Sequence, residues 1–309
     1  MGNAATGART RLLYVEEETE GTTPSTPTMK RIPWNSGSSG ISVAFATMES
    51  ARLRSDRQSE IPRRGAKTIS VNVPFESSYQ DFNAFLESLL GSTFSSGVLS
   101  NGSARGKAFT FEEGFEDLAT PQYRPARGVR SSKMKLSLTT SGIVSGSFDF
   151  IGLSSGDFSA TSLASSVADD SGNEVFDPFT GSFVEGGTSF ADAQSLELDI
   201  DATASSKHAL FSRNPSFNAV GRIKISGTLV VYFKDVSLAT KFLDGEASSL
   251  SFTLIDPDGN STAFSLPYIT YTGSSISIPE DDIPISLPFT AGVDPTTGKM
   301  ITITDTDAA

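Results

Sequence analysis

The chain has 309 residues, a formal net charge of −12 and no cysteine. The lack of cysteine excludes disulfides and thiolate metal sites, and the single histidine, His208, leaves little room for imidazole chemistry. The charge is uneven, because residues 1–140 carry 17 Lys plus Arg against 14 Asp plus Glu, whereas residues 141–309 carry 7 against 22. The length suggests two domains or one large β unit.

Residues 1–40 show no sustained periodicity, and the stretch TTPSTPTMKRIP holds three prolines, which disfavour a packed strand or helix. We therefore expect an extended N-terminal arm. A purely disordered tail is the alternative, but four apolar side chains favour an arm that packs on a neighbouring subunit: Leu12, Leu13, Tyr14 and Trp34.

The following residues alternate apolar and polar positions, the period of a strand with one buried face. The segments are 41–47, 69–75, 108–113, 133–138 and 143–151. After the second of them, a helical stripe from Tyr79 to Leu90 ends at Gly91, and Ser77 or Ser78 can cap its start. The stretch SGIVSG has the turn chemistry of a hairpin.

A second series repeats this order. Alternating segments are 196–201, 223–233, 250–255, 283–289 and 301–303, and VSLATKFL forms a short helix that Asp235 can cap and Gly245 ends. Pro284 and Pro288 favour an edge strand for the fourth segment. Strand, short helix and strand thus occur twice, which predicts a mainly β fold with two modules: an arm at 1–40, modules at 41–154 and 193–309, and a linker or inserted loop at 155–192.

One strand of the second module, SLELDIDATA, places leucine and isoleucine on its core face and a row of carboxylates on the other: Glu197, Asp199 and Asp201. The loop ESARLRSDRQSEIPRRG carries five arginines. Since it lacks interleaved aromatics and contains acids, we interpret it as a solvated or subunit-bridging loop in preference to a phosphate-binding one.

Enzyme motifs are missing. DPDGN at 256–260 resembles the start of a calcium loop, but the downstream Glu is absent, and a β-turn explains the segment better. No nucleophile elbow, phosphate loop, dinucleotide fingerprint or metal pair occurs. We therefore assign no catalytic, cofactor-binding or metal residue, and expect no cofactor. No apolar run approaches the roughly 20 residues that span a bilayer, so no membrane partner is expected.

Several segments, in this order, resemble the major tail tube proteins of long, non-contractile bacteriophage tails: YVEEETEGTTPSTP, SARLRSDRQ, FNAFLESLLGSTF, IKISGTLVVYFKDVSLATKFLDG and DGNSTAFSLPYITYTG. The resemblance covers nearly the whole chain. It implies tandem β-sandwich modules, each with a short flanking α-helix, whose strands join those of neighbours in a ring-shaped β-barrel. Such rings stack into a tube that conducts DNA.

The resemblance also implies the partners: further copies in stacked rings, a tape measure protein, other tail proteins, and DNA that passes without specific binding. It places the protein in the virion tail, assembled in the bacterial host cytoplasm. Glu197, Asp199 and Asp201 are conceivable lumen residues, although an outer solvent face fits equally well. Two modules per chain favour a trimer with pseudo-six-fold symmetry over a hexamer, and deleting residues 1–35 should leave a folded subunit that no longer polymerises.

Two other functions remain open from the residues alone. A β-sandwich adhesin or carbohydrate-binding tail decoration needs exposed aromatics on a loop, whereas Trp34 lies in the expected arm. A β-sandwich hydrolase needs two convergent carboxylates in a cleft.

Overall fold

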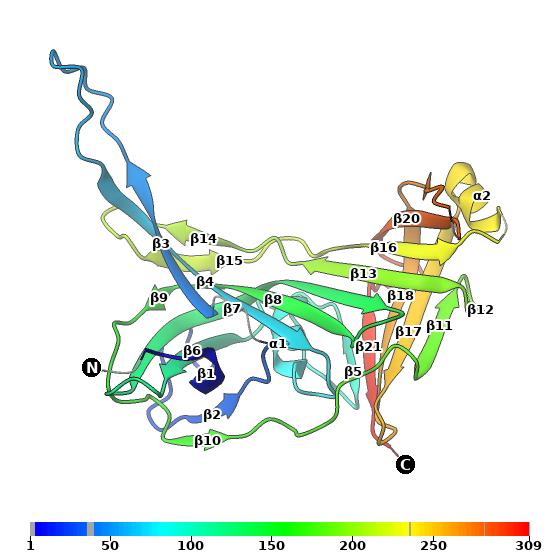
Figure 1. Cartoon of the computed structure of the whole chain (residues 1–309), viewed down its shortest axis with the longest axis horizontal. Coiled ribbons are helices and arrows are strands. Elements are labelled where there is room, and N and C mark those ends of the chain that lie inside the picture. The colour runs from blue at the N-terminus through cyan, green and yellow to red at the C-terminus, as the bar shows by residue number, and fades with distance from the viewer. Residues whose placement is uncertain (1–3, 36–39, 235, 281, 309) are drawn as a thin grey trace.

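The computed structural model describes residues 4–35, 40–234, 236–280 and 282–308. Asp235, offered by the sequence as a helix cap, lies outside this part, as do residues 36–39 of the expected arm. The fold is mainly β, with short helices, and a long hairpin of β3 and β4 that projects from the body (Figure 1). None of the described helices has the length and apolar character needed to cross a bilayer.

The elements up to residue 155 form a first series. They are η1 (Gly7–Arg9), β1 (Thr10–Glu17), β2 (Thr28–Arg31), β3 (Gly40–Met48), β4 (Arg63–Glu76), α1 (Asn83–Leu90), β5 (Val98–Ser100), β6 (Ala108–Phe115), β7 (Gln122–Thr139), β8 (Ser145–Gly152) and β9 (Ser154–Ser155).

The remaining elements form a second series. They are β10 (Ser166–Ala168), β11 (Gly181–Glu185), β12 (Thr188–Ser189), β13 (Ala193–Asp201), β14 (Ser205–His208), β15 (Pro215–Ala219), β16 (Lys224–Tyr232), α2 (Ser237–Asp244), β17 (Ala247–Ile255), β18 (Ser261–Tyr271), β19 (Ser275–Ile276), β20 (Pro284–Ala291) and β21 (Thr302–Thr306).

The same order of antiparallel pairings occurs in both series. In the first, β1 pairs with β2 and β6, β3 with β4, β4 with β8, and β7 with β6, β8 and β9. In the second, β11 pairs with β12 and β17, β13 with β16, β16 with β20, and β18 with β17, β20 and β21. Each strand of the first list therefore has a counterpart with the same partners in the second.

Among the described residues, three strand pairs join the series, one of them the short parallel pair of β2 and β10. The second half of β7 pairs antiparallel with β13, which makes one continuous sheet in the order β3-β4-β8-β7-β13-β16-β20. In addition, β5 pairs antiparallel with β21. The joint at β5 is reinforced by side chains, because Asn83 of α1 donates to Asp305 of β21 at 2.6 Å.

The first series is built around an aromatic core. Phe85 of α1 lies with its ring centroid 4.8 Å from Tyr14, 5.4 Å from Phe109 and 5.0 Å from Phe150, so it contacts β1, β6 and β8 together. The helix ends as expected at Gly91, whose backbone is left-handed (φ 63°) and whose N–H reaches the carbonyl of Glu87. Neither Ser77 nor Ser78 caps it, since the N-cap is Phe82 and the Ser78 hydroxyl donates to Asp81 instead.

A glycine under a phenylalanine recurs in the continuous sheet. Phe75 of β4 lies opposite Gly146 of β8, and Phe289 of β20 lies opposite Gly227 of β16. A Cβ added at either glycine would come within 2.3 Å of a neighbouring backbone oxygen and within 2.7 Å of the phenylalanine ring. Glycine is therefore required at both positions by the close approach of a strand and a ring.

The structure has a strand at each segment that alternates apolar and polar residues, as predicted. The segment 283–289, however, lies in β20, which is not an edge strand. β20 pairs with β16 on one side and with β18 and β19 on the other. The carbonyls of Pro284 and Pro288 both accept from residues on the β19 side. In an antiparallel ladder the backbone nitrogen and oxygen of one residue point to the same neighbouring strand, so the N–H groups that these prolines lack would also face β19. The prolines therefore limit the pairing of β20 with β19 and leave its hydrogen bonds with β16 intact.

The expected arm differs most from the structure. Leu12 and Leu13 are fully buried and Tyr14 is 7% exposed, all within the chain's own core, because β1 pairs along its whole length with β6. Trp34 is partly buried and packs against the same core. The prolines that argue against a strand lie after β1, where β2 is short, so they never interrupt it.

Residues 155–192 also differ from a simple linker. β10 returns to pair in parallel with β2, and β11 pairs with β17 as part of the second series. The poor periodicity of this segment reflects strands at sheet margins, where burial on one face is incomplete: Gly181 and Ser182 of β11 are exposed, and only Glu185 is buried.

The burial of β1 gives a direct test. Replacing Leu12 with Ala should lower the free energy of unfolding by about 2–5 kcal/mol, since it leaves a cavity in a packed core. The matched control, Leu53→Ala, removes a side chain that is fully exposed and should change stability by less than about 0.5 kcal/mol. Thermal unfolding of both variants measures the difference. Equal melting temperatures for the two variants would contradict the burial of β1. They would instead support an N-terminal arm that is free of the core, and a chain lacking residues 1–35 would then be expected to fold.

Candidate assembly surface

The continuous sheet has one apolar face and one polar face. Its core face is lined by buried aliphatic and aromatic side chains, among them Val73, Phe148, Leu136, Leu198 and Leu229. The opposite face presents mainly small polar residues at directly paired positions: Ser42, Ser70, Asn72, Ser147, Ser226, Thr228, Ser286 and Thr290. We call this the polar sheet face. It extends across both series without interruption at the β7–β13 joint.

Glu197, Asp199 and Asp201 lie on this polar sheet face, on β13 near its centre. The structure opposes them with lysines that the sequence alone could not place. Lys135 lies opposite Asp199, and Lys133 lies opposite Asp201. Lys133 also forms an ion pair with Asp199 at 3.1 Å. The carboxylate row is therefore largely compensated, and Glu197 is its most exposed member.

Two hairpins project from the body on the same side (Figure 1). The β14–β15 hairpin runs beside β4, where the Lys67 N–H donates to the Arg213 carbonyl and the His208 ring lies 3.0 Å from the Lys67 carbonyl. The turns carry exposed apolar side chains, which soluble monomers rarely group: Leu53 and Ile61 on the longer hairpin, and Leu210 and Phe211 on the shorter.

The sheet has two edges with few partners. Among the described residues, β3 pairs only with β4, and β19 only with β20. Unpaired edges present rows of backbone donors and acceptors that favour pairing with another chain. Beside β19, Ile276 and Ile278 are 47% and 82% exposed.

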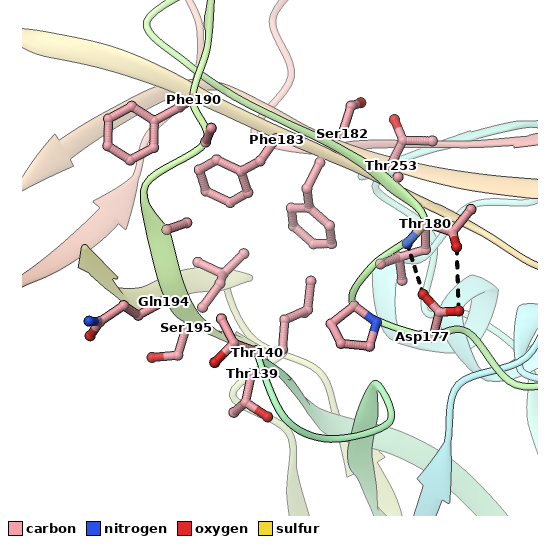
Figure 2. Close-up of a pocket in the computed structure, with 18 residues that line it drawn as sticks. Thr139, Thr140, Asp177, Thr180, Ser182, Phe183, Phe190, Gln194, Ser195 and Thr253 are labelled. Carbon is pink, nitrogen blue, oxygen red and sulfur yellow. Dashed lines mark hydrogen bonds between the residues drawn. The ribbon is translucent and has the colours of Figure 1, made fainter. Parts of the chain in front are cut away.

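A cavity of about 210 Å³ lies between the end of β7, β11, β13 and β17. Figure 2 shows Phe183 and Phe190 on one side and Thr139, Thr140 and Gln194 on another. Its one carboxylate, Asp177, accepts from the backbone N–H groups of Phe179 and Thr180, and these hydrogen bonds lower its pKa. A carboxylate committed to a turn, with no second acid lining the cavity, does not make a hydrolytic pair.

Other buried acids hold strands together. Asp305 accepts from Asn83 and from Thr262 at 2.8 Å, and its burial raises its pKa. Glu185 accepts from Lys241 of α2 and from the Tyr271 hydroxyl, and burial together with this carboxylate raises the pKa of Tyr271.

The DPDGN segment is a turn, as expected. The Asp256 carboxylate accepts from the backbone and side-chain nitrogens of Asn260, both at 2.8 Å, and thereby closes the β17–β18 hairpin. In the described part of the chain no three acidic or histidine side chains gather as a metal site.

A broad polar sheet face, open edges and protruding apolar hairpins are the features of a structural β protein that associates through its sheet. The comparisons with known proteins agree. A family model described as "Phage tail tube protein" matches residues 7–291. No curated protein matches the chain. The chain belongs to the phage tail tube protein family: it is a non-enzymatic structural protein of the virion tail, where it forms the tail tube.

Asp305 predicts a pH dependence with a defined sign. Its pKa is raised in the folded state, so the folded chain binds this proton more readily than the unfolded chain, and stability rises as the pH falls through the folded pKa. Relative to Asp305→Asn, the wild-type melting temperature should therefore improve between about pH 7 and about pH 4.

Asp294 provides the control of opposite sign. The Thr297 hydroxyl and backbone N–H donate to it and lower its pKa. Wild type should therefore lose stability relative to Asp294→Asn as the pH falls below about 4, through the unfolded and then the lowered folded pKa of this carboxyl. A difference between wild type and Asp305→Asn that is independent of pH, or that follows the sign of Asp294, would contradict the assignment.

Proposed function

We propose that three copies of this chain close into a ring with pseudo-six-fold symmetry, and that such rings stack into the tube of a long, non-contractile tail. The observation that carries the proposal is the pairing order that occurs twice along the chain. Two equivalent units per chain let three chains supply six similar positions around an axis. A hexamer of this larger subunit is the alternative.

The proposed units are tandem modules of residues 10–155 and 181–306. These bounds add β1 and β2 to the first module, and β11 and β12 to the second, because each pair contacts its own module's sheet. Each unit has a strand–helix–strand segment at the same place, with α1 after β4 and α2 after β16.

We further propose that the continuous sheet lines the tube and that its polar sheet face points to the lumen. Duplex DNA carries about one negative charge per 1.7 Å of its axis, so a wall rich in uncompensated lysine would hold it. Serine and threonine with paired charges, such as Lys133 with Asp199, offer no such grip. This supports passage of genomic DNA without specific binding. The tape measure protein and other tail proteins are proposed partners on the strength of the family.

The projecting hairpins suit contacts between stacked rings. Leu53 and Phe211 are fully exposed in the free chain, and the nearby loop is rich in arginine. Removing such side chains from water when a second ring docks contributes roughly 25 cal/mol per Å² of apolar surface. A copy in the next ring is therefore the proposed occupant of these tips, in place of the N-terminal residues expected from sequence.

Electron microscopy of the purified protein tests the ring. Rings or hollow tubes whose averages show three-fold but not full six-fold symmetry are expected, because the two modules differ in sequence and charge. An average with six identical positions would replace the trimer by the hexamer. Monodisperse single chains under all conditions would contradict the proposed ring.

Charge reversal tests the lumen assignment. Changing Glu197, which is exposed and lies opposite Ser137 and Thr228, to lysine should leave rings intact but make tubes retain more duplex DNA at about 50 mM salt, with release by about 200 mM. Co-sedimentation of labelled DNA with tubes measures retention. The matched control reverses Glu246, which is exposed between α2 and β17, outside the polar sheet face. Equal retention by both variants would place the row on the outer surface.

A further inference from the structure

The joint between β7 and β13 is a strand pairing between two halves of one chain. Leu136 of β7 lies opposite Leu198 of β13, and Lys135 lies opposite Asp199. Leu136 is only 2% exposed. One edge of β7 contacts β8 and the other contacts β13, so both flanks of the strand are paired.

The counterpart of this part of β7 in the second half is the end of β18 together with β19. On β7, Ser131 lies opposite Phe150 and Lys135 opposite Ser147, so one residue is extra on β7. On the counterpart, Tyr271 lies opposite Phe289 and Ser275 opposite Ser286, again with one extra residue. The two registers match, including the bulge. Ser275 therefore corresponds to Lys135, Ile276 to Leu136 and Ile278 to Leu138.

The burial of these counterparts differs sharply. Leu136 is buried and Leu138 packs against the core, whereas Ile276 is 47% exposed and Ile278 is 82% exposed. The difference has a simple cause, because β13 lies along the outer edge of β7, and none of the described strands lies along the outer edge of β19. The second half thus keeps the apolar side chains of a strand joint but lacks its partner strand within the chain.

The missing partner has a counterpart too. β13 corresponds to β3, because the two strands hold equivalent places in their sheets. In the second half, Leu198 of β13 lies opposite Gly227, which lies opposite Phe289. In the first half, Ile41 of β3 lies opposite Val71, which lies opposite Phe150. By the same count Ser42 corresponds to Asp199. Ser42 is exposed, as are Ala44 and Phe45 farther along the strand.

We propose that β19 of one copy pairs antiparallel with β3 of the next copy, in the register of the internal β7–β13 joint. Ser275 then lies opposite Ser42, and Ile276 lies opposite Ile41. The partner is a second copy of this chain, and the inference rests on the proposed ring. Every joint around the ring, internal or between copies, then has the same strand geometry, and the continuous sheet has no free edge left.

Part of the β3 edge is protected in the free chain. The Arg124 guanidinium donates to the Ile41 carbonyl and pairs with Glu113 at 2.7 Å. Side chains that occupy an edge in this way hinder premature pairing. The incoming β19 strand replaces the contacts that Arg124 and Glu113 make with the Ile41 backbone, whereas pairing from Ser42 onward displaces nothing that the structure shows.

The absence of native cysteine makes a disulfide test clean. The variant with Ser42→Cys and Ser275→Cys should assemble under reducing conditions and, after mild oxidation, cross-link most chains into covalent trimers on a non-reducing gel. Directly opposed residues have Cα atoms about 4.5–5.5 Å apart, within disulfide range. The internal equivalent, Lys135→Cys with Asp199→Cys, should oxidise within single chains and calibrates the efficiency.

Two further samples test register and connectivity. Ser42→Cys with Ser274→Cys shifts one residue along the strand, so the thiols face opposite sides of the sheet and should not cross-link. A mixture of chains carrying Ser42→Cys alone with chains carrying Ser275→Cys alone should yield covalent dimers and nothing larger.

The outcomes separate the two proposals. Rings or tubes by electron microscopy with cross-linking at 42 and 275 support both. Rings or tubes in which only the shifted pair, or neither pair, cross-links while the internal pair does so would overturn the β3–β19 joint and leave the tube intact. Failure of the unmodified chain to form any ring or tube would remove the proposed ring, and this joint with it.

Discussion

The backbone of a strand carries donors and acceptors on both flanks, and this structure is governed by how those flanks are satisfied. β7 shows the constraint most fully, since it pairs with β6 and β9 along its first half and with β8 and β13 along its second. One strand thereby belongs to both layers of the first half and also anchors the second half. Where pairing stops, at β3 and β19, the chain retains exposed edge positions and apolar side chains beside them.

The sequence carries enough periodic information to predict most of this architecture. Residues such as Leu196, Leu198 and Ile200 alternate with acids because one face of β13 is core, and period-2 burial is visible in any single strand. The repeated strand–helix–strand order can be predicted for the same reason. The pairing partners of the strands cannot, because alternation shows which face of the sheet a residue occupies but does not show which strand lies beside it.

That limit explains the differences. The apolar run at Leu12–Tyr14 lies in a strand buried by contacts about 100 residues away in sequence, with Phe109 and Phe111 among its partners. No local pattern reports such contacts. The carboxylates of β13 form an acidic row in the sequence, because the lysines opposite Asp199 and Asp201 belong to another strand, β7. A strand interrupted by prolines looked like an edge, although its prolines affect only one flank. The candidate surface itself, being a property of several strands together, could be predicted only through the family resemblance.

The joint between β7 and β13 has a kinetic consequence. In a ring of three such chains, half of the joints would be formed during folding, at an effective concentration that dilution cannot change. Nucleating a ring would then require a meeting of three bodies instead of six, so its rate would fall less steeply as the protein becomes scarce. A duplicated chain would in this way close rings early, when few copies have been made.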